Sequence, residues 1–493
     1  MFQSFRFLCF PSQQGSKDID PADNAHIIPR LRSIRRATNY ASIPRRVREK
    51  ALSREKSVSS TPSGRISAHP SRPQSPLTGT ISTCSSIFIS DADSQITATS
   101  ATSEIASSFP GQLVKLPATG TIPSKDIDTP YVSILQEDGT LKPPQIIFDG
   151  YGAYGGRFAP ESIIGFLTNL TSFFETAVSD PSFWAEFATY QRAQPTPLQI
   201  ASKLTARAGG ATIWLKREDQ NDYGSHKARN IIGQLLLARR MGFTEIVTDC
   251  AAAKHGNFTA AMCARMGLRC VILIGMGSLR AAITEALRYS VCNYESTYYL
   301  MGGPVGPNPL PTITRTFQAL LGEEVAAQMY EAAGCQPDAV VTAVGSGSGA
   351  VGLFRPFLQN RKIRLIGVEA AEAAALTEGE LGVLQGSRTL MLQNEDGQIR
   401  DAHSISPDLN LSTVGPELAH WKDCGRVEIQ TATDADALDG FKTMQHHEGI
   451  LAGLDSSHAV RTTLDLAEEL GPGKNVVLLV TGCDAIGLWG VNV

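Results

Sequence analysis

The stretch Gly224-Ser-His-Lys-Ala-Arg-Asn230 places a lysine at the junction between a strand pattern and a helix pattern. An apolar run over 211–215 precedes it, and the spacing of the apolar residues after it predicts a helix over about 228–241. Positive charge is disfavoured at a helix N-terminus, which favours the neutral, nucleophilic amine of Lys227. Such an amine suits Schiff-base chemistry, whereas the alternative is a solvated lysine beside a helix cap.

A second glycine-rich stretch, Gly345-Ser-Gly-Ser-Gly-Ala-Val-Gly352, follows a predicted strand and precedes a predicted helix. Alternating glycines let several backbone N–H groups converge on one phosphate, although an ordinary tight turn is the alternative. The stretch lacks the GK[ST] of a P-loop and the register of a GxGxxG dinucleotide motif. Combined with a lysine at a helix start and no metal-ligand spacing, this phosphate cradle indicates pyridoxal phosphate.

Strand and helix patterns alternate along most of the chain after about residue 143. Several strand patterns are continuous apolar runs, which are typical of parallel strands covered on both faces. We therefore predict an α/β fold with two doubly wound sheets, around 211–300 and 338–493, that face a shared cleft. The predicted strands are 211–215, 245–249, 269–274, 338–344, 364–369, 426–430 and 474–480. The predicted helices are 161–178, 181–191, 228–241, 256–266, 278–290, 312–333, 349–359, 433–447 and 456–470.

The composition excludes several classes of function. The 493 residues carry a formal net charge of −4, so nothing suggests a nucleic-acid partner. No apolar run reaches the ~18 residues of a membrane span. The nine cysteines form no CxxC pair or regular framework, which is typical of reduced thiols inside a cell.

Residues 1–140 differ in composition from the rest of the chain. An arginine-rich segment precedes a long segment that is rich in Ser, Thr and Pro and has no sustained period. Such segments bury too little apolar surface to offset their ordering entropy, so we predict a largely disordered N-terminal extension. We expect a cytoplasmic protein, and mitochondrial targeting by the arginine-rich segment is the alternative.

From about Ile147 to its C-terminus the chain resembles the tryptophan synthase β chain, one of the fold-type II pyridoxal-phosphate enzymes. The resemblance implies a catalytic domain over 141–493, with subdomains at about 195–310 and at 311–493 together with 141–194, and the cofactor between them. It rests on Tyr-Gly-Gly-Arg-Phe-Ala-Pro-Glu (154–161), Pro-Thr-Pro-Leu (195–198), Leu-Lys-Arg-Glu-Asp (215–219), His-Lys (226–227), Lys-His-Gly (254–256), Gly-Ser-Gly-Ser-Gly (345–349), His-Ser-Ile-Ser (403–406), Val-Gly-Pro-Glu (414–417) and Asp-Ser-Ser-His-Ala (455–459).

The resemblance also implies a role for each site residue. Lys227 would bind the cofactor as a Schiff base and move protons at the substrate α-carbon, and Asp249 would be the general acid/base. The hydroxyl of Thr481 would lie near the pyridine nitrogen. The implied cofactor-binding residues are Lys227, His226, Gly345, Ser346, Gly347, Ser348, Gly349, Asp455 and Thr481. The implied substrate-binding residues are Cys250, Ala251, Ala252, Ala253, Lys254, His255 and Asn410.

The activity implied is that of a pyridoxal-phosphate-dependent carbon–oxygen lyase. It would replace the hydroxyl of L-serine with indole or an indole-like nucleophile, giving L-tryptophan or an analogue. A diverged β-eliminating or β-replacing enzyme of specialised metabolism and a cofactor-binding pseudoenzyme are the alternatives. The family expectation is a homodimer, and a monovalent cation is a further cofactor that the resemblance raises. About 140 polar N-terminal residues are too few for an α-chain-like barrel, so any α chain would be a separate partner.

The chain departs from the family pattern at several positions. Asp249 stands where the family has a glutamate, Asn410 where it has an aspartate, and Arg229 where it has an asparagine. Ala251 and Ala253 replace glycines of the substrate-carboxylate loop. Directly after Gly277 the family carries about one further helix and strand of its mobile domain, which this sequence lacks. These changes motivate the two alternatives to the family's activity.

Overall fold

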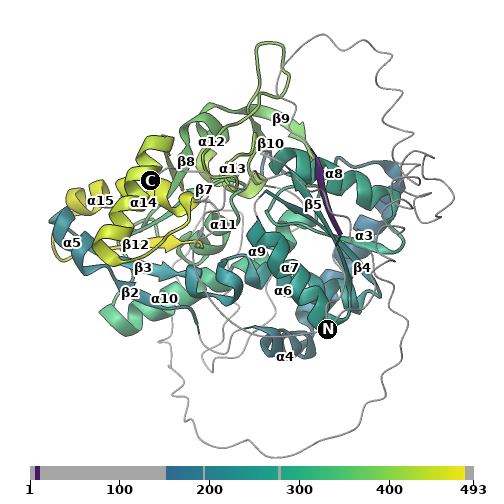
Figure 1. The fold of residues 1–493 in the computed structure, drawn as a ribbon, viewed down its shortest axis with the longest axis horizontal. Coiled ribbons are helices and arrows are strands. Elements are labelled where there is room, and N and C mark those ends of the chain that lie inside the picture. Colours follow the sequence, from purple (N-terminus) through teal and green to yellow (C-terminus); the bar gives the residue numbers. More distant parts are fainter. Residues whose placement is uncertain (1–5, 11–150, 192–194, 252, 276–278, 483–493) are drawn as a thin grey trace, which may run out of the picture. The chain divides into compact units, whose positions relative to one another are not determined.

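The computed structural model describes residues 6–10, 151–191, 195–251, 253–275 and 279–482 (Figure 1). All of these residues belong to one unit of the fold. Two sheets and the helices that cover them make up the described chain. The predicted extension over 1–140 lies outside the described residues, apart from residues 6–10.

The larger sheet has six strands, in the order β11-β8-β7-β12-β3-β2. All neighbouring strands are parallel except β2, which is antiparallel to β3. The strands are β2 (Leu198–Ile200), β3 (Thr212–Arg217), β7 (Ala339–Val344), β8 (Arg364–Ala370), β11 (Glu428–Ala432) and β12 (Asn475–Val480). One face packs on α5 (Ser202–Ala208), α14 (Asp434–Glu448) and α15 (Leu454–Leu470), and the other on α10 (Leu320–Ala333) and α11 (Ser348–Phe354).

Strand β12 shows why its sequence is apolar at every position after the first. Side chains alternate across a strand, so Val477 and Leu479 enter the core under α10 and α11. Val476, Leu478 and Val480 enter the core under α14 and α15. A parallel strand covered on both faces needs apolar residues throughout, as the sequence predicted.

The smaller sheet has four parallel strands, in the order β1-β5-β4-β6. Its strands are β1 (Arg6–Phe10), β4 (Glu245–Cys250), β5 (Arg269–Gly275) and β6 (Thr297–Leu300). It shares one apolar core with α3 (Glu161–Ser179), α4 (Pro181–Tyr190), α6 (Ala228–Arg240), α7 (Ala253–Met266), α8 (Leu279–Cys292) and α9 (Leu310–Gln318). The two sheets confirm the predicted α/β class.

One predicted sheet assignment is wrong. The strand predicted over 211–215 is β3, and it pairs with β12 and β2 in the larger sheet instead of joining β4. The chain crosses from one sheet to the other between β3 and α6. A local apolar pattern cannot predict which sheet a strand joins, because the pairing depends on residues far along the chain.

Strand β1 was not expected from the sequence. It pairs in parallel with β5, so that Arg6 lies opposite Val271 and Phe10 lies opposite Gly275. Strand β5 ends at Gly275, and α8 begins at Leu279. The intervening residues 276–278, where the family's extra helix and strand would begin, lie outside the described residues.

The remaining elements are short and lie outside the two sheets. They are α12 (Ala375–Glu378), α13 (Pro416–Asp423), the antiparallel pair β9 (Glu380–Leu384) and β10 (Ser387–Met391), and 3₁₀ turns at Glu218–Gln220, Asp222–Gly224, Arg355–Phe357 and Ala371–Ala373. The predicted helix over 312–333 is two helices, α9 and α10, which meet at Ala319. Among the described helices, none has the length and apolarity to cross a membrane.

Candidate active site

Lys227 lies directly before the first residue of α6, as its sequence predicted. Its backbone carbonyl accepts the first helical hydrogen bond, from the N–H of Ile231 at 3.0 Å. The preceding residues are tied to the end of β12, because the N–H of His226 donates to the carbonyl of Thr481 at 2.9 Å. The lysine is therefore fixed between the start of a helix of the smaller-sheet core and the C-terminal end of the larger sheet.

The charge around Lys227 differs from what the sequence led us to expect. Its amine lies 3.5 Å from the carboxylate of Asp408, and its side chain is only 12% exposed. Burial lowers the pKa of Lys227, but the carboxylates of Asp408 and Asp249 outweigh burial and hold the pKa above its ordinary value. The site therefore favours the charged amine, and the expectation that the helix terminus would favour the neutral amine is wrong.

Asp408 is a site residue that the sequence analysis missed. Burial raises the pKa of Asp408, but the positive charges of Lys227 and Lys254 outweigh burial and lower the pKa. Its position could have been inferred, because it follows the His-Ser-Ile-Ser motif and precedes Asn410 by two residues. Asn410 is half-buried, and its N–H donates to the carbonyl of Pro407 at 3.3 Å.

The glycine-rich segment 345–349 connects β7 to α11, as predicted. Gly347 has a φ of +96°, a conformation that side chains rarely adopt. A Cβ on Gly349 would lie 3.2 Å from a methyl of Leu479 and 3.8 Å from Nε2 of His226. The segment thus offers bare backbone where two elements converge, and Ser346 and Ser348 lie in it with their side chains buried.

His226 links this loop to the end of β12. Its Nδ1 lies 3.2 Å from the carbonyl of Thr481, so Nδ1 carries the proton and donates. Nε2 then accepts a hydrogen bond from the hydroxyl of Ser348 at 2.9 Å. Burial, together with the charge of Lys227, lowers the pKa of His226 to about 4, so the ring is neutral at pH 7. His226 therefore contacts the glycine-rich segment through Ser348.

Thr481 and Asp455 are also brought together, at the C-terminal end of the central strand β12. The hydroxyl of Thr481 donates to the carboxylate of Asp455 at 2.5 Å, and it lies 2.7 Å from the hydroxyl of Ser456. The N–H of Thr481 donates to Ser456 at 2.9 Å. All three side chains are buried. Ser456 was not predicted, although it directly follows Asp455 in a quoted motif.

Asp249 lies near the end of β4, in the smaller sheet. The hydroxyl of Tyr299, on the adjacent strand β6, donates to its carboxylate at 2.8 Å. Burial raises the pKa of Asp249, against the lowering effect of Tyr299 and Lys227. Tyr299 was missed because β6 is only four residues long and was not recognised as a strand. Asp249 therefore combines a buried carboxyl with hydrogen-bond donors from Tyr299 and from the backbone, which is an arrangement suited to proton transfer.

The predicted substrate-binding run 250–255 joins β4 to α7. The helix begins at Ala253, so the run ends at a helix N-terminus, where backbone N–H groups favour an anion. Ala251 precedes the helix and is half-buried, while Ala252 lies outside the described residues. Lys254 lies beside the backbone of Gly482, 3.3 Å from where a Cβ would stand.

Cys250 and His255 are both unsuited to acid–base chemistry at neutral pH. Burial raises the pKa of the Cys250 thiol to about 12, and it lowers the pKa of His255 to about 3. Thr248 donates to the carbonyl of Leu300 at 2.8 Å, so Nε2 of His255 must donate to Thr248 at 2.9 Å. Nδ1 of His255 is then a buried acceptor without a protein partner in the described structure.

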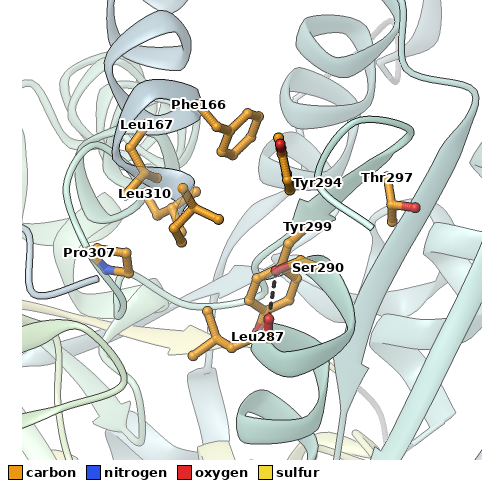
Figure 2. A pocket seen from close by; sticks show the side chains of 10 residues that line it. Phe166, Leu167, Leu287, Ser290, Tyr294, Thr297, Tyr299, Pro307 and Leu310 are labelled. Atoms are coloured by element: carbon orange, nitrogen blue, oxygen red, sulfur yellow. Dashed lines mark hydrogen bonds between the residues drawn. The ribbon is translucent and has the colours of Figure 1, made fainter. Parts of the chain in front are cut away.

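Apolar space lies behind Tyr299. Its ring lines a small pocket of about 20 Å³ together with Phe166, Leu287 and Leu310, as Figure 2 shows. A more open pocket of about 420 Å³ shares Leu287 and Pro307 with it. Tyr299 thus stands between Asp249 and an apolar pocket. Among the described residues, no cluster of three His, Cys, Asp or Glu side chains could hold a metal ion.

The chain is similar in sequence to a known enzyme family and to two tryptophan synthases. A family model described as pyridoxal-phosphate dependent enzyme matches residues 190–482. The chain is 40% identical over 371 residues to the tryptophan synthase beta chain of Allorhizobium ampelinum, a match that covers 68% of this chain and 91% of that protein. It is also 40% identical over 370 residues to the tryptophan synthase of Saccharomyces cerevisiae, covering 67% of this chain and 52% of that protein.

The chain thus spans about half the length of the yeast relative. Among solved structures, a threonine deaminase from T.th. matches with a TM-score of 0.46 and 17% sequence identity. That match covers 64% of this chain and 97% of the other.

Proposed function

Because this chain belongs to the family of pyridoxal-phosphate-dependent enzymes and is similar to tryptophan synthase beta chains, we propose that it catalyses β-replacement on L-serine. In the proposed reaction, the hydroxyl of serine leaves as water and an indole-like nucleophile takes its place on the β-carbon. The product is L-tryptophan or an analogue. Pyridoxal phosphate is the cofactor of the family, and it would supply an electron sink for the bond-breaking steps at the substrate α-carbon.

The residues present fit that cofactor. The glycine segment 345–349 offers backbone N–H groups and no side chain at Gly347 or Gly349, as a phosphate requires. Lys227 directly follows His226, which contacts this segment through Ser348. Lys227 is the residue that would bind the aldehyde carbon. The hydroxyl of Thr481 would face the ring nitrogen, with its own proton held by Asp455.

The other side chains would handle the substrate and its protons. The backbone N–H groups at the start of α7 would bind the serine carboxylate. Lys227 would take the α-proton once its amine is free. Asp249, whose pKa is raised by burial, would give a proton to the departing hydroxyl.

One observation carries the proposal: the hydrogen bond at 2.9 Å between His226 and Ser348. It joins the residue next to Lys227 to the glycine-rich segment, although the two are separated by 122 positions in the sequence. The proposed anchor for the aldehyde and the proposed anchor for the phosphate are thereby held as one unit. Without this contact the two motifs would be unrelated features of the chain.

The test is product analysis by mass spectrometry. Protein loaded with pyridoxal phosphate is incubated with serine, with and without indole, beside the Lys227→Ala variant. The proposal predicts tryptophan only when both substrates are present and none from the variant. Turnover that Lys227→Ala leaves unchanged would overturn it.

A second candidate is a diverged enzyme that eliminates water from serine or adds a different nucleophile. It is favoured by Asp408 beside Lys227, a carboxylate that brings negative charge close to the amine. In the same experiment an enzyme that eliminates water would form pyruvate and ammonia from serine alone, and one that adds a different nucleophile would form no tryptophan from serine and indole. A protein that binds the cofactor without turnover would show neither product.

A further inference from the structure

Asp408 and Lys227 form an ion pair at the centre of the site. The carboxylate oxygen Oδ1 and the amine nitrogen are 3.5 Å apart, and the two side chains are only 22% and 12% exposed. At this separation and depth the attraction between the charges is much stronger than on the surface. The pair has no part in the proposed roles of Lys227, which require the amine to lose its proton.

The backbone holds Asp408 in this place from two sides. On one side, a Cβ on Gly345 would come within 2.4 Å of the carbonyl oxygen of Asp408, so only glycine lets the two segments approach so closely. On the other side, the N–H of Leu409 donates to the carbonyl of Ser406 at 3.0 Å and closes a turn around Asp408. The segment is anchored further back, where the N–H of Ile405 donates to Asp434 at 2.9 Å.

Other titratable groups also face the pair, and two of the carboxyl groups among them accept hydrogen bonds from hydroxyl groups. The carboxyl of Asp249 accepts a hydrogen bond from Tyr299, and the carboxylate of Asp455 accepts one from Thr481. The groups that face Lys227 besides Asp408 are Asp249, Cys250 and Asp455. Those that face Asp408 besides Lys227 are Lys254, His226 and His255.

We propose that Asp408 is a positioning residue for Lys227, and that its carboxylate holds the charged amine in place whenever that amine is not bonded to the cofactor. The inference rests on the proposed function, because it gives Asp408 a part in the attachment of pyridoxal phosphate to Lys227. Two consequences follow. Asp408 keeps the free amine in reach of the aldehyde, and it sets the pH above which the amine becomes nucleophilic.

The test is reconstitution of the cofactor-free full chain over a range of pH. Pyridoxal phosphate is added, and the rate at which its visible absorbance band changes on binding a lysine is followed at each pH. In Asp408→Asn the midpoint of this rate profile should move to lower pH by about 1 unit or more, because an opposite charge close to the amine has been removed. Asp408→Glu keeps a carboxylate and should move the midpoint back toward that of the natural chain.

Two controls separate this role from a structural one. Asp401→Asn removes a carboxylate on the same segment that is 74% exposed and pairs with Arg280, and it should leave the midpoint in place. A merely structural role for Asp408 would lower the rate at every pH without moving the midpoint, and that result would overturn the inference. If Asp408→Asn fails to fold by circular dichroism, Asp408→Ser is measured in the same way.

The two proposals fail in different ways. If the natural chain attaches the cofactor and Asp408→Asn has the same midpoint, only the role of Asp408 is lost. If the natural chain never attaches the cofactor to Lys227, the proposed function falls, and the role of Asp408 falls with it.

Discussion

At Lys227 the helix terminus and the surrounding carboxylates act on the amine in opposite directions. The start of α6 disfavours positive charge, while Asp408 and Asp249 favour it and prevail. The residue pattern itself predicted Lys227 and the glycine segment, and the resemblance to the tryptophan synthase β chain implied His226 and Asp249. Asp408 was missed although its place beside the His-Ser-Ile-Ser motif pointed to it, and Tyr299 could not be predicted, because its contact with Asp249 depends on pairing between β4 and β6. The roles assigned to these residues stay predictions.

Burial raises the pKa of Asp249 and the hydroxyl of Tyr299 lowers it, which gives a test at the scale of one hydroxyl. Tyr299→Phe removes the donor at 2.8 Å that stabilises the carboxylate form, so the pKa of Asp249 should rise further. Loss of one hydrogen bond to a charged group corresponds to about 1 pKa unit. If the protonated carboxyl is the active form, activity should persist to higher pH in the variant. The measurement is the pH profile of product formation from serine and indole.

Tyr298→Phe is the matched control for this variant. Tyr298 is buried on the same strand, but its hydroxyl donates to Gln234 at 3.3 Å, on the side away from Asp249. Its pH profile should coincide with that of the natural chain. A basic limb that does not move in Tyr299→Phe would remove Asp249 from the proposed proton transfer.

At the scale of elements, the long apolar strands and amphipathic helices were predictable and the short ones were not. The seven predicted strands are all confirmed to within a few residues, because each is a run in a parallel sheet. Strands β2 and β9 escaped prediction, since the first has three residues and the second exposes alternate apolar side chains such as Leu381 and Val383. The break between α9 and α10 at Ala319 also escaped prediction.

Helix α11, which begins in the glycine segment, packs backbone to backbone against the end of α9. A Cβ on Gly352 would lie 2.5 Å from the carbonyl oxygen of Gln318. Gly352→Ala should therefore lower the free energy of unfolding by about 1–3 kcal/mol, as overpacking does. Gly165→Ala, at an exposed position in α3 with nothing within 4 Å of the new Cβ, should raise it by about 0.5–1 kcal/mol. Chemical denaturation measures the free energy of unfolding of each variant. If the two substitutions change it equally, the account of the packing of α11 against α9 is wrong.

The start of α6 is also tied to the larger sheet by a buried cluster of charges. Arg229 donates to Glu218 and Glu324 at 2.7 Å each, and Lys216 donates to Glu324 at 2.7 Å. The two positive side chains and the two negative side chains therefore neutralise each other's charge in a buried cluster. Arg229 departs from the family pattern at this position, and the cluster gives that departure a structural reason.

Removal of one member should leave the others uncompensated. Arg229→Met is expected to lower the free energy of unfolding by about 3–5 kcal/mol, because a buried carboxylate loses its partner. Arg364→Met breaks an exposed pair with Glu428 at 2.7 Å and should cost about 0–1 kcal/mol. Denaturant titration compares the two. A cost for Arg229→Met as small as that for Arg364→Met would mean that the cluster contributes no stability.

At the scale of the whole molecule, a strand near the start of the chain completes the smaller sheet. Strand β1 covers the edge of β5, in the sheet that also carries Asp249, although the paired residues Arg6 and Val271 are remote in sequence. The α/β class and the family were within reach of the sequence. The position of β1 and the crossover of β3 into the larger sheet were not, because both depend on pairing between remote segments.

Backbone pairing of β1 with β5 can be tested by proline substitution. In a parallel ladder alternate residues direct their N–H groups to a given neighbour, so one of Phe7→Pro and Leu8→Pro should remove a hydrogen bond to β5. That variant should be less stable than the corresponding alanine variant by about 1 kcal/mol or more. Phe7→Ala and Leu8→Ala keep the N–H group and serve as controls in thermal unfolding. If neither proline variant differs from its alanine control, β1 contributes nothing to the folded sheet.

The central claim is a covalent bond between the amine of Lys227 and pyridoxal phosphate, and trapping with borohydride tests it most directly. Protein loaded with the cofactor is reduced, digested and mapped by mass spectrometry. The account predicts a phosphopyridoxyl group on the peptide that contains Lys227. A group on another lysine, or on none, would contradict it.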